Sequence, residues 1–504
     1  MSNRTLVISL STSWTNAFAA EFEYVKTQID AGDEVVVLGC SGGIERCLGK
    51  LVDSSPGQCQ QCMHRRRILY SQLNRTKGIT YVELPVAQIQ SPLGDLTIEE
   101  VASFEISGKK FGLAAMSTLI FADRTLPRTG TAPTIALELL RSSISVYEAI
   151  SEFVKVSARF DNALVFNGRF ADAYGALSAV RDNQMSYTVY ETLGPDKRYI
   201  TFENATPHSL AAQTVRAMRY VENVVCRPDL LNVGRDFFEQ KRLGNYTNDH
   251  AYITPEYSQF VLPDVYTGRK IISIFNSSED EIRYTEYAAN YESLWFASQF
   301  DAIKQIVQSY SGDDDYVIIL RVHPNIDTGD PQELEELLSL SSENLIVIPP
   351  TQKISSYSII DQSHVVISFF STIGVEATYW GVPSISLSPN PYANVGVSRF
   401  TKSLRDLRNI IDSDIAPSSQ YSAIAYAAML MDGIAFKFIE GAFPHYRYGK
   451  LNLSEIGRYK LESRVFNLIY GIGLRTSIAQ SIAMLVRPIS AMKQFFISRG
   501  KSER

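Results

Sequence analysis

The sequence predicts an α/β protein of two domains, each built on a mostly parallel sheet. Short apolar runs rich in β-branched residues, such as 317–320, have the length of buried parallel strands. These runs alternate with helical stretches, the pattern of βαβ units. At 504 residues the chain is too long for one ordinary core, so two domains are expected.

The first half opens with a βαβ unit that favours a parallel sheet. Its predicted elements are a strand over 5–9, a helix over 17–31, a strand over 34–38, a helix over 133–158 and strands over 162–166 and 187–190. Residues 93–141 give no clear pattern. Periodicity is lost around 249–269, near Pro255 and Pro263, so we place the boundary between domains 1–255 and 256–455 there.

The second half predicts a five-strand doubly wound domain. Strands are expected over 270–275, 316–320, 345–348, 365–368 and 384–387, with helices over 331–340, 355–360 and 374–380, and an alanine-rich core helix within 415–431. Because the carboxyl ends of parallel strands meet at one edge of a sheet, we expect a ligand to bind there.

Composition excludes some classes of function. Hydrophobic residues make up 45% of the chain and charged residues 20%, as in an ordinary globular enzyme. A net charge of −6 and the lack of a basic arm argue against nucleic-acid binding. The chain shows no secretory signal and no run of about 20 apolar residues, so a cytoplasmic protein is expected.

Four of the five cysteines lie close together in an insertion over 40–67: Cys40, Cys47, Cys59 and Cys62. In a reducing compartment such a group binds metal more often than it forms disulfides, and a structural zinc is our first hypothesis. The first pair is spaced more widely than in usual zinc ribbons, so reduced thiols and an iron–sulfur cluster stay open. The isolated Cys226 is expected in the core.

Polar side chains follow several predicted strands of the second half. The candidates for binding an anion are Asn276, Ser277, Ser278, Arg321, His323, Ser371, Thr372, Gly374 and Glu376. A helix start beside two hydroxyls offers N–H groups to a phosphate. Taken singly, Arg-x-His-Pro could be a capped strand end and Ser-Thr an N-cap pair. Their recurrence at one expected sheet edge favours function.

The first half repeats this arrangement. Asn167 and Arg169 follow one strand, Glu191 is expected to follow the next, and His208 lies further along the chain. We interpret Asn167 and Arg169 as acceptor or cleft residues. The alternative is a tight turn at Asn167 and a solvated acid at Glu191.

The tail, 456–504, predicts an amphipathic helix. Apolar residues from Leu474 to Phe496 recur at steps of three and four, and the segment is basic. This pattern is typical of a helix on an anionic membrane surface, here the inner face of the cytoplasmic membrane. The alternative is a helix packed on the protein and kinked at Pro488.

The Arg321-Val-His323-Pro motif, together with the run from Ser371-Thr372 through Glu376 to Gly381-x-Pro383, resembles the GT-B glycosyltransferases of bacterial surface polysaccharides. Within that group it is similar to capsule proteins such as Kdo transferases, polysialyltransferases and their teichoic-acid relatives. The resemblance covers roughly 270–387. It implies a GT-B-like fold, with two Rossmann-like domains facing a central cleft.

The resemblance also implies a function and a set of roles. His323, Ser371 and Thr372 would hold the phosphate of a CMP-, CDP-, UDP- or GDP-sugar, and Glu376 would contact the ribose. The acceptor would be a growing glycan or a glycolipid. No cofactor is required for transfer, because Asp313-Asp314-Asp315 precedes a strand and is interpreted as a solvated loop.

The catalytic base of such an enzyme usually comes from the amino-terminal domain. Glu191 is our candidate, with His208 in reserve. Two alternatives stay open: a UDP-sugar 2-epimerase of the same architecture, and a non-catalytic nucleotide-binding scaffold of a polysaccharide assembly complex.

Overall fold

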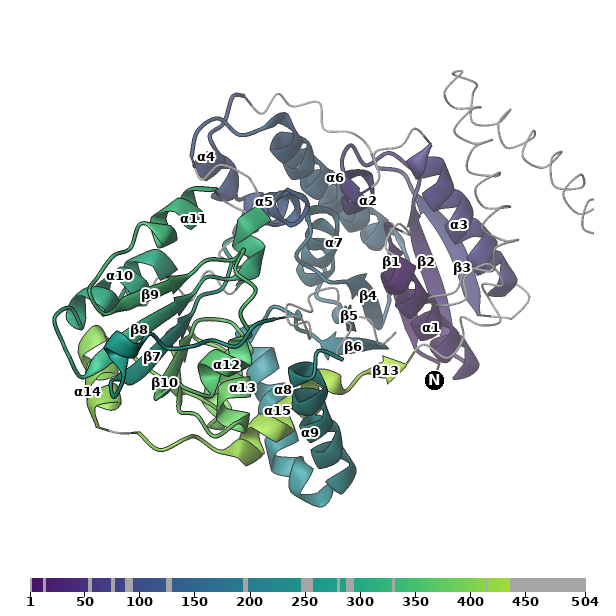
Figure 1. Cartoon of the computed structure of the whole chain (residues 1–504). Helices are drawn as coiled ribbons and strands as arrows, with labels where there is room; N and C mark the ends of the chain where they lie inside the picture. Colours follow the sequence, from purple (N-terminus) through teal and green to yellow (C-terminus); the bar gives the residue numbers. More distant parts are fainter. Residues whose placement is uncertain are drawn as a thin grey trace, which may run out of the picture.

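The computed structural model contains two Rossmann-like α/β sheets, each with helices packed on it (Figure 1). It describes residues 2–11, 15–52, 57–73, 78–86, 94–123, 129–193, 198–245, 257–278, 282–286, 294–328, 331–413 and 415–435. The α/β class and the two Rossmann-like domains predicted from the sequence are confirmed.

The amino-terminal sheet has seven strands in the order β13-β6-β5-β4-β1-β2-β3. Its strands are β1 (Arg4–Ser9), β2 (Glu34–Cys40), β3 (Ile79–Leu84), β4 (Asn162–Phe166), β5 (Ser186–Leu193), β6 (Arg198–Glu203) and β13 (Ile434–Ala435). Its helices are α1 (Thr15–Asp30), α2 (Leu48–Val52), α3 (Gln58–Leu73), α4 (Ile98–Ala102), α5 (Phe111–Ala122), α6 (Thr134–Val156) and α7 (Ala171–Asp182). The strand order reverses between β1 and β4, which pair in parallel.

The carboxy-terminal sheet has six strands in the order β12-β11-β10-β7-β8-β9. They are β7 (Lys270–Phe275), β8 (Tyr316–Arg321), β9 (Leu345–Ile348), β10 (Val365–Ser368), β11 (Ser384–Ser386) and β12 (Arg399–Phe400). The helices here are α10 (Gln299–Ser309), α11 (Pro331–Leu338), α12 (Ser356–Ile360), α13 (Ile373–Tyr379), α14 (Leu404–Asp412) and α15 (Gln420–Met431). The five predicted strands all form, and the two-residue β12 is added at the edge.

Two helices between the sheets belong to a core shared with the end of the chain. Helices α8 (Leu210–Asn223) and α9 (Pro228–Arg242) pack against α15, with Phe237 and Phe238 buried beside Tyr379 and Ile424 (Figure 1). After α15 the chain returns to the first sheet, where β13 pairs antiparallel with β6. The two domains are therefore joined by two crossings of the chain.

The region that gave no sequence pattern, 93–141, contains α4 and α5. Helix α5 is apolar on nearly all sides, and most of it is buried in a core with α6. A helix buried all round lacks the one-sided stripe by which an amphipathic helix is recognised. This explains why the sequence pattern did not reveal it.

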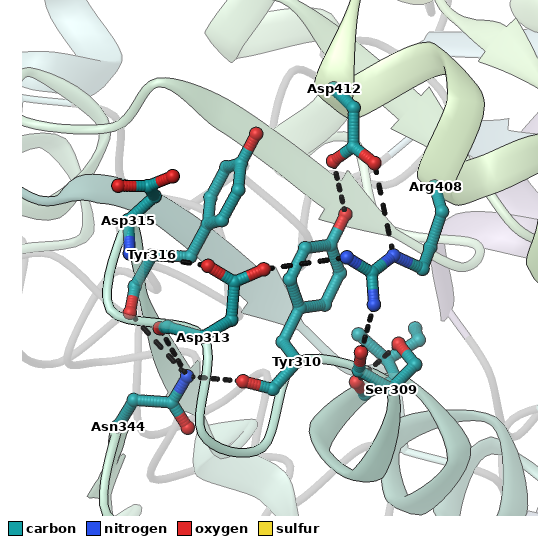
Figure 2. Close-up of polar contacts among 9 residues, drawn as sticks. Ser309, Tyr310, Asp313, Asp315, Tyr316, Asn344, Arg408 and Asp412 are labelled. Atoms are coloured by element: carbon teal, nitrogen blue, oxygen red, sulfur yellow. Dashed lines mark hydrogen bonds and ion pairs between the residues drawn. The ribbon is translucent and has the colours of Figure 1, made fainter.

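The Asp313-Asp314-Asp315 run lies at the amino-terminal end of β8, opposite the edge that carries His323. Figure 2 shows that the Asp313 carboxylate contacts the Arg408 guanidinium, 3.4 Å away, and accepts the N–H of Asp315. Arg408 also lies over the Tyr310 ring and reaches Asp412. Asp314 and Asp315 are exposed, while Asp313 helps to attach α14 to α10.

Two further expectations concern surface features. Cys226 was expected in the core, and that prediction is wrong: its side chain is exposed, because the apolar run before it ends in a short 3₁₀ turn at the end of α8. Among the described helices, none has the length and apolar content needed to span a bilayer. The predicted helix over 456–504 lies outside the described residues.

Candidate functional site

The order of the carboxy-terminal sheet reverses beside β7, which has β8 on one side and β10 on the other. Open α/β sheets bind ligands at such a point, beyond the carboxyl ends of the strands. Asn276 and Ser277 follow β7 directly and connect the loops on both sides. The Asn276 Oδ1 accepts the N–H of His323, 3.0 Å away, and the Ser277 Oγ accepts the N–H of Phe370 at 3.2 Å.

These two hydrogen bonds bring the predicted donor-site loops to one sheet edge. The segment holding His323 follows β8, and the segment holding Ser371 and Thr372 follows β10. His323 Nδ1 accepts the N–H of Asn325, 3.2 Å away, which orients the imidazole within its loop. Asn276 and Ser277 are buried, so their role here is to position the two loops.

The hydroxyls of Ser371 and Thr372, at the start of α13, form hydrogen bonds with residues of the same helix. Ser371 Oγ accepts the N–H of Ile373 at 3.3 Å, and Thr372 Oγ1 donates to Glu376 at 3.1 Å. Thr372 is the N-cap residue of α13, but its side chain makes no capping hydrogen bond, and Ser371 lies one residue before it, so the N-cap alternative does not account for this pair. At Gly374, an added Cβ would lie 2.7 Å from Ser368 Oγ, so the glycine allows α13 to pack closely on the sheet.

Glu376 is buried, with 2% of its surface exposed, and both of its carboxylate oxygens are held. Lys241 Nζ lies 2.7 Å from Oε1, and the Tyr357 hydroxyl donates to Oε2 at 2.6 Å. The ammonium of Lys241 also approaches Thr372 Oγ1 at 3.4 Å. In this structure Glu376 therefore connects the start of α13 to α9 and α12.

Lys241 was not found from the sequence. It lies at the end of α9, more than a hundred residues before Thr372, in a segment without a recognisable motif. Only the packing of α8 and α9 on α15 brings this ammonium to the sheet edge. It places a positive charge beside the predicted phosphate site.

Replacing Lys241 with methionine should destabilise the protein by about 2 kcal/mol, because a buried carboxylate loses its charged donor. We expect no larger effect, since the ammonium is partly exposed and Tyr357 and Thr372 still donate to Glu376. Urea unfolding measures the loss. The double variant Lys241→Met, Glu376→Gln should recover most of it; a double variant no more stable than the single one would contradict the pairing.

One predicted donor residue, Arg321, makes its hydrogen bond outside this group. The Arg321 side chain is buried, and its NH1 donates to the carbonyl of Pro349 at 2.7 Å. Burial lowers the pKa of Arg321 from its usual range. Ser278 is buried as well. The structure therefore gathers Asn276, Ser277 and His323 with the α13 start, whereas Arg321 supports the turn after β9.

The first-half candidates form a second cluster, centred on Asn167. Its amide nitrogen donates to a Glu191 carboxylate oxygen and lies 3.3 Å from His208 Nε2, while its Oδ1 accepts the N–H of Arg169 at 3.1 Å. Asn167 has φ 55°, in the left-handed region that asparagine tolerates better than most residues. All four residues predicted from the sequence therefore lie together.

Glu191 was expected just after a strand, and this detail is wrong. Strand β5 continues to Leu193 because it pairs antiparallel with β6, where Glu191 faces Ile200. The carboxylate is placed by this hairpin. Its Oε1 accepts the N–H of Thr192 at 2.9 Å.

Burial shifts the pKa of both titratable groups of the cluster, Glu191 and His208. It raises the pKa of Glu191, opposed by hydrogen bonds from Asn167 and Thr192. It lowers the pKa of His208 to about 3, helped by the nearby Arg169 charge. His208 is thus neutral at pH 7, and its Nε2 can accept the second hydrogen of the Asn167 amide. The cluster combines a carboxylate of increased basicity with a neutral imidazole.

The four cysteines of the insertion are all free thiols in this structure. Among the described residues, no three His, Cys, Asp or Glu side chains lie close enough together to bind a metal ion. The buried Arg66 occupies part of this region, with its guanidinium 3.4 Å from Cys62 Sγ and 3.0 Å from the carbonyl of Cys40. The structural zinc stays a prediction, which the zinc content of the purified protein tests.

The carboxy-terminal domain contacts the amino-terminal domain at two places, the segment after β6 and the core of α4, α5 and α6. The Thr206 hydroxyl, two residues before His208, donates to Glu286 at 2.9 Å. Tyr284 is buried in the core formed by α4, α5 and α6. The segment after β7 therefore contacts the amino-terminal domain beside its polar cluster.

No protein-family model matches the chain, and no curated protein matches it. Solved structures do resemble it. A beta Kdo 2,4 transferase, KpsC of Thermosulfurimonas dismutans, shares 14% identity with a TM-score of 0.33, covering 53% of this chain and 79% of its own. The calicheamicin glycosyltransferase CalG4 shares 10% identity over 88% of this chain and 99% of its own, with a TM-score of 0.29.

A UDP-GlcNAc 2-epimerase of Neisseria meningitidis, solved with UDP-GlcNAc, shares 13% identity and gives a TM-score of 0.29. The match covers 85% of this chain and 98% of the epimerase. Transferases and epimerases thus both occur among the similar structures.

Proposed function

We propose that the protein is a glycosyltransferase that moves a sugar from a nucleotide-sugar to a glycan or glycolipid acceptor of a bacterial surface polysaccharide. The observation that supports this most is the joining of two loops at one edge of the carboxy-terminal sheet. Asn276 and Ser277 hold the His323 loop and the loop of Ser371 and Thr372 together. Lys241 adds an ammonium at the same place.

This arrangement suits the departure of a nucleotide. Transfer builds negative charge on the leaving phosphate, and fixed donors and cations at that position stabilise the transition state. In the proposal, His323 and Lys241 take this role, and no metal is needed for transfer. Glu191 removes the proton from the acceptor hydroxyl, because burial makes its carboxylate more basic.

Substitution of His323 by alanine tests the donor site. We expect the affinity for the donor nucleotide to fall about tenfold or more, because a charge-assisted hydrogen bond to phosphate is lost. A thermal-shift screen of the wild type against CMP, CDP, UDP and GDP identifies the nucleotide, and titration of that nucleotide measures the loss.

The matched control is His364→Ala, at the amino-terminal end of β10, which should bind nucleotide as the wild type does. Equal affinities in the His323 and His364 variants would refute the donor site.

The products separate the enzyme classes: a transferase consumes nucleotide-sugar only with an acceptor. An epimerised sugar formed without an acceptor would instead favour the 2-epimerase alternative.

A further inference from the structure

A cavity of about 410 Å³ lies in the amino-terminal domain, and no sequence motif pointed to it. Its walls include the ends of β1 and β4, at Leu10 and Phe166. These are the two strands between which the order of the first sheet reverses. The cavity therefore lies at the position where an open α/β sheet binds ligands, and its volume suits a small organic molecule.

The lining is mostly apolar and aromatic. Three phenylalanines, Phe121, Phe166 and Phe170, line it together with aliphatic side chains from α2, β1 and β4. A bare sugar carries a hydroxyl on most of its carbons, and each buried hydroxyl needs a hydrogen-bond partner. This lining cannot supply so many partners. The cavity instead suits a ring or chain with few polar atoms.

Two carboxylates interrupt the apolar wall. Glu21 is held by the hydroxyls of Tyr70, at 2.7 Å, and Tyr190, at 3.2 Å. Asp172, in the first turn of α7, is 5% exposed and lines the cavity. Among the described residues it receives hydrogen bonds only from backbone N–H groups, one of them that of Ala173 at 3.0 Å. Asp172 thus has capacity to accept a hydrogen bond from a ligand.

The cavity adjoins the polar cluster described above. Phe166 immediately precedes Asn167, and Tyr190, another lining residue, immediately precedes Glu191. The Arg169 guanidinium lies over the rings of Phe121, 5.7 Å away, and Phe170, 4.8 Å away. The charge of Arg169 also acts on Glu191 and His208, so this side chain connects the cavity to the residues that contact the acceptor in the proposed reaction.

We propose that this cavity binds the apolar portion of the acceptor, a ring system or hydrocarbon chain with a hydroxyl or N–H group that donates to Asp172. The inference rests on the proposed function and narrows its acceptor to a glycolipid or other apolar glycoside. A free polysaccharide end would not fill the cavity.

Fluorescence titration with N-phenyl-1-naphthylamine, a neutral apolar probe with an N–H donor, tests the site. One equivalent should bind. Ala173→Leu fills the cavity and should weaken binding about tenfold, since overpacking excludes the ring. Ala158→Leu, the same change at the exposed amino-terminal side of β4, should leave it unchanged. Equal binding by both variants would overturn the assignment.

If Ala173→Leu does not fold, Phe121→Ala serves instead, because Phe121 is partly exposed and its loss removes one wall. Phe121→Ala should also weaken binding of the probe, and an unchanged affinity for the probe would refute the site. In competition, n-hexyl β-D-glucoside below its micelle concentration should displace the probe and glucose should not. Displacement by glucose alone would contradict an apolar site.

Nucleotide binding by the same proteins separates the two proposals. Wild type and Ala173→Leu should both be stabilised by the donor nucleotide, since the cavity belongs to the other sheet. Probe binding without any nucleotide binding would refute the donor site and, with it, the acceptor role of the cavity. Nucleotide binding without probe binding would refute the cavity proposal alone.

Discussion

Glu191→Gln should lower the rate of sugar transfer by about 10²- to 10⁴-fold, the usual contribution of a general base. Glutamine keeps the size of the side chain, and its one amide oxygen can still accept one of the two hydrogen bonds that Asn167 and Thr192 donate to the carboxylate. It cannot take a proton. The affinity for nucleotide should stay at the wild-type value, because the donor site lies on the other sheet. Transfer assays at saturating donor measure the loss.

The pH profile gives an independent check of Glu191. The carboxylate must be ionised to act as a base, so wild-type transfer should fall as pH drops through its raised pKa. The residual activity of the glutamine variant should lack this decrease. Glu203→Gln, an exposed carboxylate on the paired strand β6, should retain wild-type transfer. Full activity in Glu191→Gln would assign the base elsewhere, with His208 the next candidate.

Asp172→Asn should stabilise the protein at pH 7 by about 3 kcal/mol. Burial raises the pKa of Asp172 from 3.8 to about 6, so the folded protein binds this proton more tightly than the unfolded chain does. The tighter proton binding by Asp172 therefore adds to the free energy of unfolding below pH 4, and this contribution is lost as pH rises to about 6. Above that, the wild type holds an ionised carboxylate in an apolar wall. Asparagine removes this penalty.

Urea unfolding at pH 4 and pH 7 measures the effect: the variant should gain stability at pH 7 only. Asp182→Asn at the other end of α7 is the matched control. Lys109 and the Tyr147 hydroxyl lower the pKa of Asp182, so its contribution is present at pH 7 and is lost as pH falls. The two variants should therefore change stability in opposite directions at pH 7. A gain for Asp172→Asn that does not vary with pH would contradict its raised pKa.

A carboxylate that weakens the fold at neutral pH is an expected feature of a functional cavity. Proteins tolerate such residues where binding or catalysis needs them, since function and stability compete at sites. The stability gain of Asp172→Asn and its effect on ligand binding are therefore separate measurements. The first concerns the burial of the charge, and the second concerns the proposed acceptor.

The class of fold and much of the polar site could be predicted from local patterns. Strands β4, β7 and β10 have the predicted bounds, because buried parallel strands are continuous apolar runs. The cluster of Asn167, Glu191 and His208 also forms as a group. The meeting of parallel strand ends at one edge accounts for Asn167, which follows β4, whereas the β5–β6 hairpin places Glu191 and the segment after β6 brings His208.

The remaining features depend on contacts between distant segments. Helix α5 has no apolar stripe, and no local pattern singled out Lys241 in the last turn of α9 or Asp172 in the first turn of α7. Arg321 ends its strand as expected, yet its side chain reaches the carbonyl of Pro349 on the neighbouring loop. Side-chain direction at a strand end follows from what packs beside it, and that is decided by residues far along the chain.

By itself, the sequence determined two α/β sheets and the polar residues at their carboxyl edges, because strand periodicity and loop chemistry are local properties. The tertiary structure alone decided that Lys241 meets Glu376, and that the ends of β1 and β4 enclose an apolar cavity beside Glu191. Lys241 and Glu376 are 135 residues apart in the sequence, and the cavity is lined by several separate segments. Neither feature leaves a pattern among neighbouring residues, so both depend on how the chain packs.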